Sequence, residues 1–523
     1  MRRLPTLLTL LLLLVGALPA LAQEESPPTL EEMRQMLEAQ HELIVKQGDE
    51  LARQGQLLTH QQQTLDAITR VLGEAAARGT FPATATHSSS PKYALASTQS
   101  TQDESLPAPE VAKKKGDAAE DSASQDKPTS AQDERLARET SVPTDILREG
   151  DFPGSIHLPG TDLNAKVGGF VRLSTVNNLD PIGSDDRFIV GSIPPEGEAT
   201  AGEAARSTIS AKRSRVNMDI RMDSDVGLFR AFLEGDFAGD GGTENYRLRH
   251  AYGQFNKLLL GQTWSTFMDL SAIPEDVDFE GLSAQINVRH PLMRWAGLAL
   301  IGQNWAFAFE DPEPSFSGGD GSSTFSDVVM NTSWSRSRRH MQLGLLGRTL
   351  KGKETLEDGT QGKADSALGY GLSLSGTVAA NRRNNLDNLK FQLNAGKGIG
   401  NYVNDLRSIG GQDGVFDPET GRLELLPVFA GYVGYQRWWK PESDSAFVNT
   451  LRSTLVYSYV YIDNYDFQPG DAYKATQRAT MNLMVSPISS LDLGMEFLWG
   501  SRRNKDNSLG EALQWQLVAT FRF

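Results

Sequence analysis

Large apolar and polar residues alternate one by one in segment after segment between about Lys166 and Phe523. In the last segment, LQWQLVATFRF (513–523), the odd positions are mostly large and apolar, and most even positions are polar: Gln514, Gln516, Thr520 and Arg522. Successive side chains of a β-strand point to opposite faces, so a period of two gives each strand an apolar and a polar face. The pattern predicts a series of two-faced strands of roughly ten residues each.

The predicted strands are joined alternately by short turns and long connections. Short turns are expected near 223–226, 256–257, 295–298, 335–340, 382–386, 441–445 and 487–490, and long connections near 178–207, 238–245, 267–283, 310–326, 351–366, 399–422, 463–472 and 500–510. In a soluble sandwich the apolar faces would pack on a second sheet, with turns of similar length at both ends. The asymmetry instead favours an all-β transmembrane barrel of about 16 antiparallel strands over residues 155–523, with lipid outside and water inside.

The first residues have the pattern of a signal peptide, predicted over 1–22. Arg2 and Arg3 precede an apolar run, and Ala20-Leu21-Ala22 forms a small-x-small cleavage site. The mature chain is therefore expected to leave the cytoplasm. Beyond this segment no run of roughly 18 or more apolar residues exists, which excludes a helical membrane protein.

Composition excludes several further classes of protein. The chain has 0 cysteines, so it offers neither a disulfide scaffold nor a thiolate metal site. Its histidines stand singly, without the spacing of zinc ligands, and we predict no metal. A formal net charge of -15 argues against a general nucleic-acid binder, which needs basic surface.

Two further segments precede the predicted barrel. Leucine or isoleucine recurs at every seventh position from Leu30 to Leu72, which predicts an α-helical coiled coil over 23–78. The second core position is mostly glutamine, so a solvated amphipathic helix is the alternative. Residues 79–154 are rich in Ser, Thr, Ala, Pro and charged residues, and we predict a disordered linker there.

Arginines recur in the inward phase of the predicted strands. The positions are Arg172, Arg213, Arg215, Arg221, Arg230, Arg247, Arg249, Arg289 and Arg348. A guanidinium group stays charged and pairs through two hydrogen bonds with carboxylate or phosphate, so a row of them would give an anion a graded path. The alternative is that these arginines only neutralise Asp219, Glu234 and Asp236 inside a filled barrel.

The long connection 267–283 is acidic and is predicted to fold into the barrel and narrow it. Its acids are Asp269, Glu275, Asp276, Asp278 and Glu280. We expect them to face the arginine wall and to produce a transverse field.

No catalytic constellation is present in the sequence. GKGIGNY (396–402) has Gly398 where a phosphate-binding loop needs Ser or Thr, and no helix pattern follows it. His250, His290 and His340 lack a serine or acid at convincing spacing. We therefore predict neither an enzyme nor a cofactor.

Several ordered motifs resemble those of the DcaP-like outer-membrane porins. They are SIHLPGTDLNAKVGGFVRL (155–173), FLEGDF (232–237), YRLRHAYGQF (246–255), LLGQTWSTFMD (259–269), NLKFQLNAGKGIGNYVNDL (388–406), VGYQRWW (433–439) and the final FRF. Ending on Phe523 is also similar to the carboxyl-terminal aromatic signal of outer-membrane barrels. We expect the last strand to pair with residues near 167–173, and removal of Phe523 to impair assembly.

The resemblance implies a 16-stranded trimeric barrel that admits small anions, with dicarboxylates and related organic acids as the substrate class. Arg215, Arg247 and Arg249 fall on motif positions where lumen arginines are expected. Arg437 stands where the family pattern suggests histidine. The resemblance also implies an outer-membrane location, with the heptad region in the periplasm.

We therefore predict a passive outer-membrane porin for small anionic solutes. Its partners would be outer-membrane lipid, two further copies in a homotrimer and, through the coiled coil, peptidoglycan or another periplasmic component; nucleic acid is not expected. The alternatives are a phosphate-selective or general porin, and an envelope-spacing structural protein in which the barrel is incidental.

Overall fold

The computed structural model describes residues 149–197, 205–239, 245–300, 303–323, 325–356, 358–381 and 386–523. The predicted signal peptide, the predicted coiled coil and residues 79–148 of the predicted linker lie outside this part of the chain. No helix in the described ranges is both long and apolar enough to cross a membrane.

Sixteen antiparallel strands form one closed barrel, which confirms the predicted fold and strand number. The strands are β2 (Asn164–Asn178), β4 (Arg215–Ser224), β5 (Gly227–Gly239), β6 (Asn245–Phe255), β7 (Leu258–Trp264), β8 (Arg289–Leu300), β9 (Gln303–Glu310), β12 (Asp327–Arg336), β13 (Arg339–Thr355), β14 (Gln361–Ala379), β15 (Asn388–Lys397), β18 (Pro427–Trp438), β19 (Arg452–Ile462), β20 (Tyr473–Ile488), β21 (Leu491–Asn504) and β22 (Leu509–Arg522).

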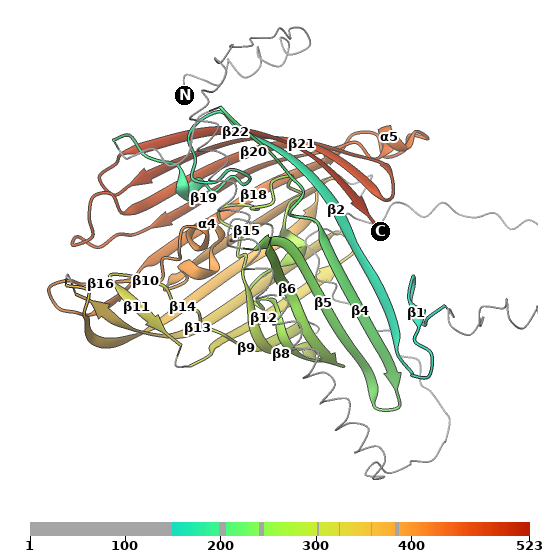
Figure 1. The fold of residues 1–523 in the computed structure, drawn as a ribbon, viewed down its shortest axis with the longest axis horizontal. Helices are drawn as coiled ribbons and strands as arrows, with labels where there is room; N and C mark the ends of the chain where they lie inside the picture. The colour runs from blue at the N-terminus through green and yellow to red at the C-terminus, as the bar shows by residue number, and fades with distance from the viewer. Residues whose placement is uncertain are drawn as a thin grey trace, which may run out of the picture. The chain divides into compact units, whose positions relative to one another are not determined.

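The barrel closes where its first strand meets its last. β2 pairs with β4 on one side and with β22 on the other, and Val171 lies opposite Phe521. Phe523 and Gly169 exchange backbone hydrogen bonds of 3.1 and 3.3 Å. Figure 1 shows β2, in cyan, beside β22, in red. The predicted pairing of the last strand with residues near 167–173 is confirmed, and it gives both strands the two neighbours that a spanning strand needs in lipid.

Alternation in the sequence becomes a difference in exposure between the two faces. On β22, Leu517 and Phe521 are 42% and 50% exposed, whereas Gln514 and Gln516 are 2% exposed. The apolar side chains therefore point away from the barrel and the polar ones into it. Lipid is the medium that covers such a continuous apolar outer face.

Shorter elements lie in the connections between barrel strands. The long connections after β2, β7, β9 and β15 carry β3 (Arg206–Ser210), β10 (Phe316–Ser317), β11 (Gly319–Ser322), β16 (Gly414–Phe416), β17 (Leu423–Leu425), α4 (Asn404–Ser408) and the 3-10 turns η2 (Val190–Ser192), η3 (Leu270–Ala272) and η4 (Gly400–Tyr402). β1 (Ile156–His157) precedes β2, and α5 (Ala446–Asn449) lies between β18 and β19.

Several predicted connections are wrong. The long connections expected near 238–245 and 500–510 are short, because β5 ends at Gly239 and β6 begins at Asn245, and β21 ends at Asn504 and β22 begins at Leu509. The short turn expected near 441–445 belongs to a longer connection, from 439 to 451, that carries α5. The turn expected near 295–298 lies inside β8, where the pairing with β9 shifts register between Trp295 and Leu298. Such an irregularity interrupts the period of two, as a turn also does. The long connection expected near 351–366 is short, because β13 continues to Thr355 and β14 begins at Gln361.

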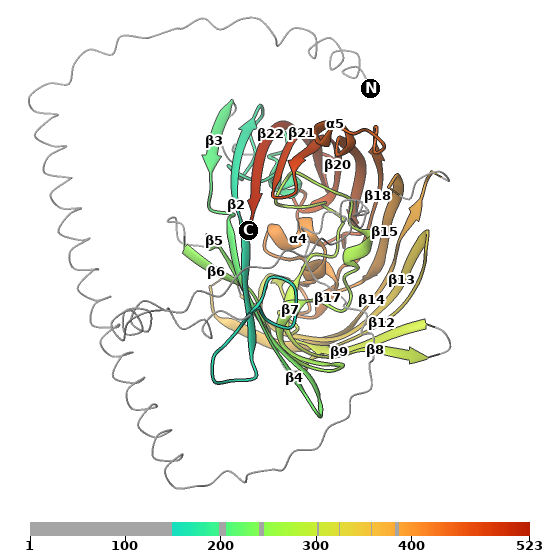
Figure 2. The ribbon, with the colours of Figure 1, turned by 90° about the vertical axis from the view of Figure 1, so that its right-hand side faces the viewer.

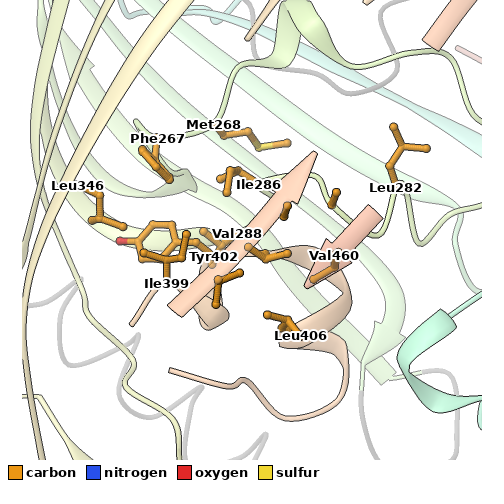
Figure 3. Close-up of a cluster of buried hydrophobic side chains, with 14 of the residues drawn as sticks. Phe267, Met268, Leu282, Ile286, Val288, Leu346, Ile399, Tyr402, Leu406 and Val460 are labelled. Carbon is orange, nitrogen blue, oxygen red and sulfur yellow. The ribbon is translucent and has the colours of Figure 1, made fainter. Parts of the chain in front are cut away.

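The largest apolar cluster lies inside the barrel, on the inward-folded connections. Phe267, Leu282 and Ile286 from the connection after β7 pack with Tyr402 and Leu406 from the connection after β15, and all five have no exposed surface. Figure 3 shows this cluster, and Figure 2 shows α4 within the ring of strands. Each fully buried side chain of this kind contributes about 1.5–3 kcal/mol to stability. Part of the interior is therefore a packed core, which limits the space open to water.

Candidate functional site

The connection between β7 and β8 folds against the inner face of the barrel strands, and polar contacts hold it there. At its start, both carboxylate oxygens of Asp269 lie 3.0 Å from Nε2 of His340 on β13, and Ser375 on β14 donates a 2.6 Å hydrogen bond to Asp269. Lys390 on β15 donates a 2.7 Å hydrogen bond to the carbonyl oxygen of Ile273. We call residues 265–288 the inward loop.

Glu275 attaches the middle of the inward loop to the next strands. Arg452 on β19 donates two hydrogen bonds of 2.7 Å to its carboxylate, and Gln436 on β18 donates one of 3.1 Å. The guanidinium of Arg452 is 2% exposed. A two-pronged pair shielded from water in this way fixes both position and orientation of the loop.

The following acids form the third attachment, on β20 and β21. Arg478 lies 3.1 Å from Asp276 and 3.2 Å from Asp278. Glu496 on β21 accepts hydrogen bonds from the backbone amides of Val277 and Asp278, at 3.1 and 2.7 Å. These acids thus bind the wall formed by β18–β21.

Glu275, Asp276 and Asp278 therefore do not pair with the predicted arginines. Their partners are Arg452 and Arg478, which sequence reasoning missed, whereas Asp269 contacts His340 and Glu280 contacts Arg187. A signal existed for Arg478, because Thr476, Thr480 and Asn482 share its inward phase. Arg452 lies at the start of a strand whose alternation is poor, so its direction was not readable from the sequence.

Four of the predicted arginines form a cluster on the opposite wall, which we call the arginine cluster: Arg215 on β4, Arg247 and Arg249 on β6, and Arg289 on β8. Arg247 and Arg249 each contact Asp236, at 2.8 and 2.9 Å. Glu234 lies 3.6 Å from Arg215 and 3.4 Å from Arg249. Among the described residues, Arg215, Arg247 and Arg249 therefore contact these two carboxylates, and Arg289 lies beside them.

Arg289 is the member of the arginine cluster with the fewest attachments. Its guanidinium lies 4.4 Å from the ring of Trp264, and no described carboxylate forms an ion pair with it. It is close enough to Arg215, Arg247 and Arg249 to be repelled by each of them. This excess of positive charge makes the cluster a place where an anion is stabilised.

Arg213 lies just before β4 and is held by a separate acid. Its guanidinium is 2.8 Å from Asp186, which Lys212 also contacts at 2.8 Å. Burial by itself would raise the pKa of Asp186, but Arg213 and Lys212 outweigh it and hold the pKa below its ordinary value of 3.8. The pair ties the connection after β2 to the wall that carries the arginine cluster.

Arg221 and Arg230 form a second, smaller group. Both donate to Asp219, at distances of 2.7–3.2 Å for Arg221 and 2.9 Å for Arg230. Two guanidinium groups share one carboxylate here, so this group also carries excess positive charge. Arg221 additionally lies 4.2 Å from the ring of Phe152.

The last two predicted arginines lie apart from the cluster. Arg172 on β2 donates to the carbonyl oxygen of Val277 in the inward loop. Arg348 on β13 lies 2.8 Å from both Asp327 and Asp413, and all three side chains are fully buried. Arg348 therefore holds connections together and offers no surface to a solute.

A cavity of about 500 Å³ lies against the inward loop. Its lining includes Arg172, Arg215 and Arg452 as well as Glu275, Asp278 and Phe279. The two acids named here are already paired with Arg452 and Arg478. No group of three His, Cys, Asp or Glu residues in the described ranges is arranged to hold a metal ion.

Comparison with known proteins identifies the family. The DcaP outer membrane protein family matches residues 161–523. The chain belongs to this family. It is accordingly an outer-membrane channel protein and not an enzyme.

Two solved structures are similar to this chain at low sequence identity, and the first of them shares its fold. The outer membrane channel DcaP of Acinetobacter baumannii is 20% identical, with a TM-score of 0.58 over 69% of this chain and 97% of that one. An anion-selective porin from Comamonas acidovorans is 12% identical, with a TM-score of 0.44 over 69% of this chain and 100% of that one. The comparison with curated proteins finds no match.

Proposed function

We propose that this outer-membrane channel conducts small anionic solutes passively, with dicarboxylates and related organic acids as its substrate class. The observation that carries the proposal is the arginine cluster, in which Arg289 lies beside three arginines that contact Glu234 and Asp236 and itself forms no ion pair with a described acid. A carboxylate solute supplies the charge that the cluster lacks.

The ion pairs of the inward-loop acids also support selectivity for anions over cations. Glu275, Asp276 and Asp278 are paired with Arg452 and Arg478, so their repulsion of an anion is reduced. Guanidinium groups that already share a carboxylate bind a passing anion less tightly than isolated ones would. Moderate binding permits release, which conduction requires.

Reversal potentials across a salt gradient test the proposal. Wild-type channels in potassium chloride are expected to prefer anions, and Arg289→Ala should lower the anion-to-cation permeability ratio. One unit charge about 4 Å from the path is worth about 1 kcal/mol in water, so a change of up to about fivefold is expected.

Arg437→Ala is the matched control for this experiment. Arg437 is exposed on the outward phase of β18 and stacks 5.2 Å from the ring of Trp439, so its loss should leave the permeability ratio unchanged. Cation preference in the wild-type channel would refute the proposal.

We also propose a homotrimer, as the family resemblance implies. An apolar hollow of about 380 Å³ on the outer face of β4–β7 supports it, with Ile220, Met222, Phe229 and Leu260 in its lining. Because the chain has 0 cysteines, Met222→Cys would be the single thiol. A fluorophore attached to this thiol should be shielded from a lipid-soluble quencher in membranes if a second copy covers the hollow, whereas a hollow covered only by lipid would leave it fully quenched.

The periplasmic placement of the amino-terminal region stays a prediction. A protease that is added to the periplasmic side of intact outer membranes should release it.

A further inference from the structure

Phe279 lies at a point of the inward loop where the backbone is held on both sides. The preceding residue, Asp278, accepts a 2.9 Å hydrogen bond from Gln516 on β22 and pairs with Arg478. The following residue, Glu280, lies 3.0 Å from Arg187 in the connection after β2. These attachments hold the residues on both sides of Phe279, so its ring can move aside only by rotation about its own side-chain bonds.

The ring of Phe279 faces three guanidinium groups at once. The ring centroid is 4.2 Å from Arg213 and 5.3 Å from both Arg215 and Arg249. These distances lie within the range of cation–π attraction, in which the negative face of the ring attracts the cation.

Phe279 also separates two of these guanidinium groups from the cavity. Phe279 and Arg215 line the cavity, whereas Arg213 and Arg249 do not, and they are 5% and 2% exposed. The ring therefore covers positive charge that would otherwise be available to a solute in the cavity.

We propose that Phe279 is a specificity-determining residue that acts as a gate: its ring covers Arg213 and Arg249 and moves aside when an anion binds them. The inference rests on the proposed anion pathway and adds a residue to it. A solute carboxylate pairs with a guanidinium through two charge-assisted hydrogen bonds, which are stronger than the attraction of a neutral ring. An anion therefore displaces Phe279, and the ring returns when the anion leaves.

A gate of this kind limits how long an anion remains bound at these arginines. Because the anion must displace the ring of Phe279 from the guanidinium groups, its net binding free energy is smaller. This keeps several closely spaced arginines from trapping a dianion, since conduction needs sites that bind weakly enough to release.

Single-channel recording with succinate as the probe tests the proposal on three variants of Phe279. Phe279→Ala uncovers the arginines and should lengthen succinate dwell times about twofold to fivefold, the factor that a cation–π contact is worth. Phe279→Tyr keeps the ring and should behave as the wild type does. Phe279→Leu keeps apolar bulk without the ring face and should fall between the two.

The outcomes separate this inference from the proposed function. Wild-type cation preference would overturn both. Wild-type anion preference together with unchanged succinate dwell times in Phe279→Ala would overturn only the gating role of Phe279. Heat-modifiable migration on gels is the control that shows a folded barrel in this variant. Equal dwell times in Phe279→Leu and Phe279→Tyr would show that the ring face has no part in the effect and would also overturn this role.

Discussion

Two walls of the same barrel carry inward arginines, but the supply of acids differs between them. On the wall of β4–β8, Arg215, Arg247 and Arg249 contact Glu234 and Asp236, and Arg289 lies beside them without an ion pair to a described acid. On the wall of β18–β21, Arg452 and Arg478 meet Glu275, Asp276 and Asp278 of the inward loop. The role of an inward arginine therefore depends on its partners: Arg452 and Arg478 hold the loop, and we propose that Arg289, without such a pair, attracts anionic solute.

Replacing Arg478 should cause the largest loss of stability. Arg478→Met leaves Asp276 and Asp278 without their cation, and an uncompensated buried charge costs about 3–5 kcal/mol. The unfolding midpoint in urea, followed by tryptophan fluorescence, should fall accordingly. The matched control is Arg289→Met on the other wall, which leaves no described acid without its ion-pair partner and should change stability little. Equal losses of stability in both variants would contradict the proposed difference between the walls.

A charge exchange at the loop attachment should give an intermediate effect. Glu275→Arg places like charges at the 2.7 Å contact with Arg452, and adding Arg452→Glu restores opposite charges. The double variant should recover about 1–3 kcal/mol relative to the sum of the single ones, the usual coupling of residues in direct contact. Additive losses in this double-mutant cycle would mean that the pair does not hold the loop.

The smallest expected effect is the pH dependence of the tie between Asp186 and Arg213. Arg213 and Lys212 lower the pKa of Asp186 from 3.8, despite its burial. The stabilisation is therefore fully present above about pH 4 and is lost as the pH falls through the lowered pKa of the folded state. In Asp186→Asn, the melting temperature should therefore fall less on acidification than in the wild type. If it falls as much as in the wild type, the ion pair between Asp186 and Arg213 is not the source of the pH dependence.

Phe279 connects the two walls, and this connection was absent from sequence reasoning. The prediction for the connection 267–283 concentrated on its acids, because charge patterns are visible in a linear sequence. An aromatic residue between two acids carries no such signal. Its role becomes visible only when Asp278 and Glu280 are seen attached elsewhere, with the ring left over Arg213, Arg215 and Arg249.

The alternating pattern of the sequence was enough to predict the barrel, its closure and the faces of most strands. In 513–523 the period of two separated Gln514 and Gln516 from Leu517 and Phe521, because side chains of a strand must alternate. The same rule placed Arg215 and Arg249 on the inner face. The bulge at 295–298 escaped this reading, since it breaks the period locally.

Which acidic and basic side chains form ion pairs follows from the tertiary structure and could not be predicted from the sequence. Glu275 and Arg452 are 177 positions apart, and neither strand register nor hydrophobic period links a connection to a distant wall. The burial of Arg348 between Asp327 and Asp413 likewise depends on how two long connections fold inward. Local rules fix the direction of a side chain, whereas its partner across the lumen depends on the closed barrel and on the path of the loops inside it.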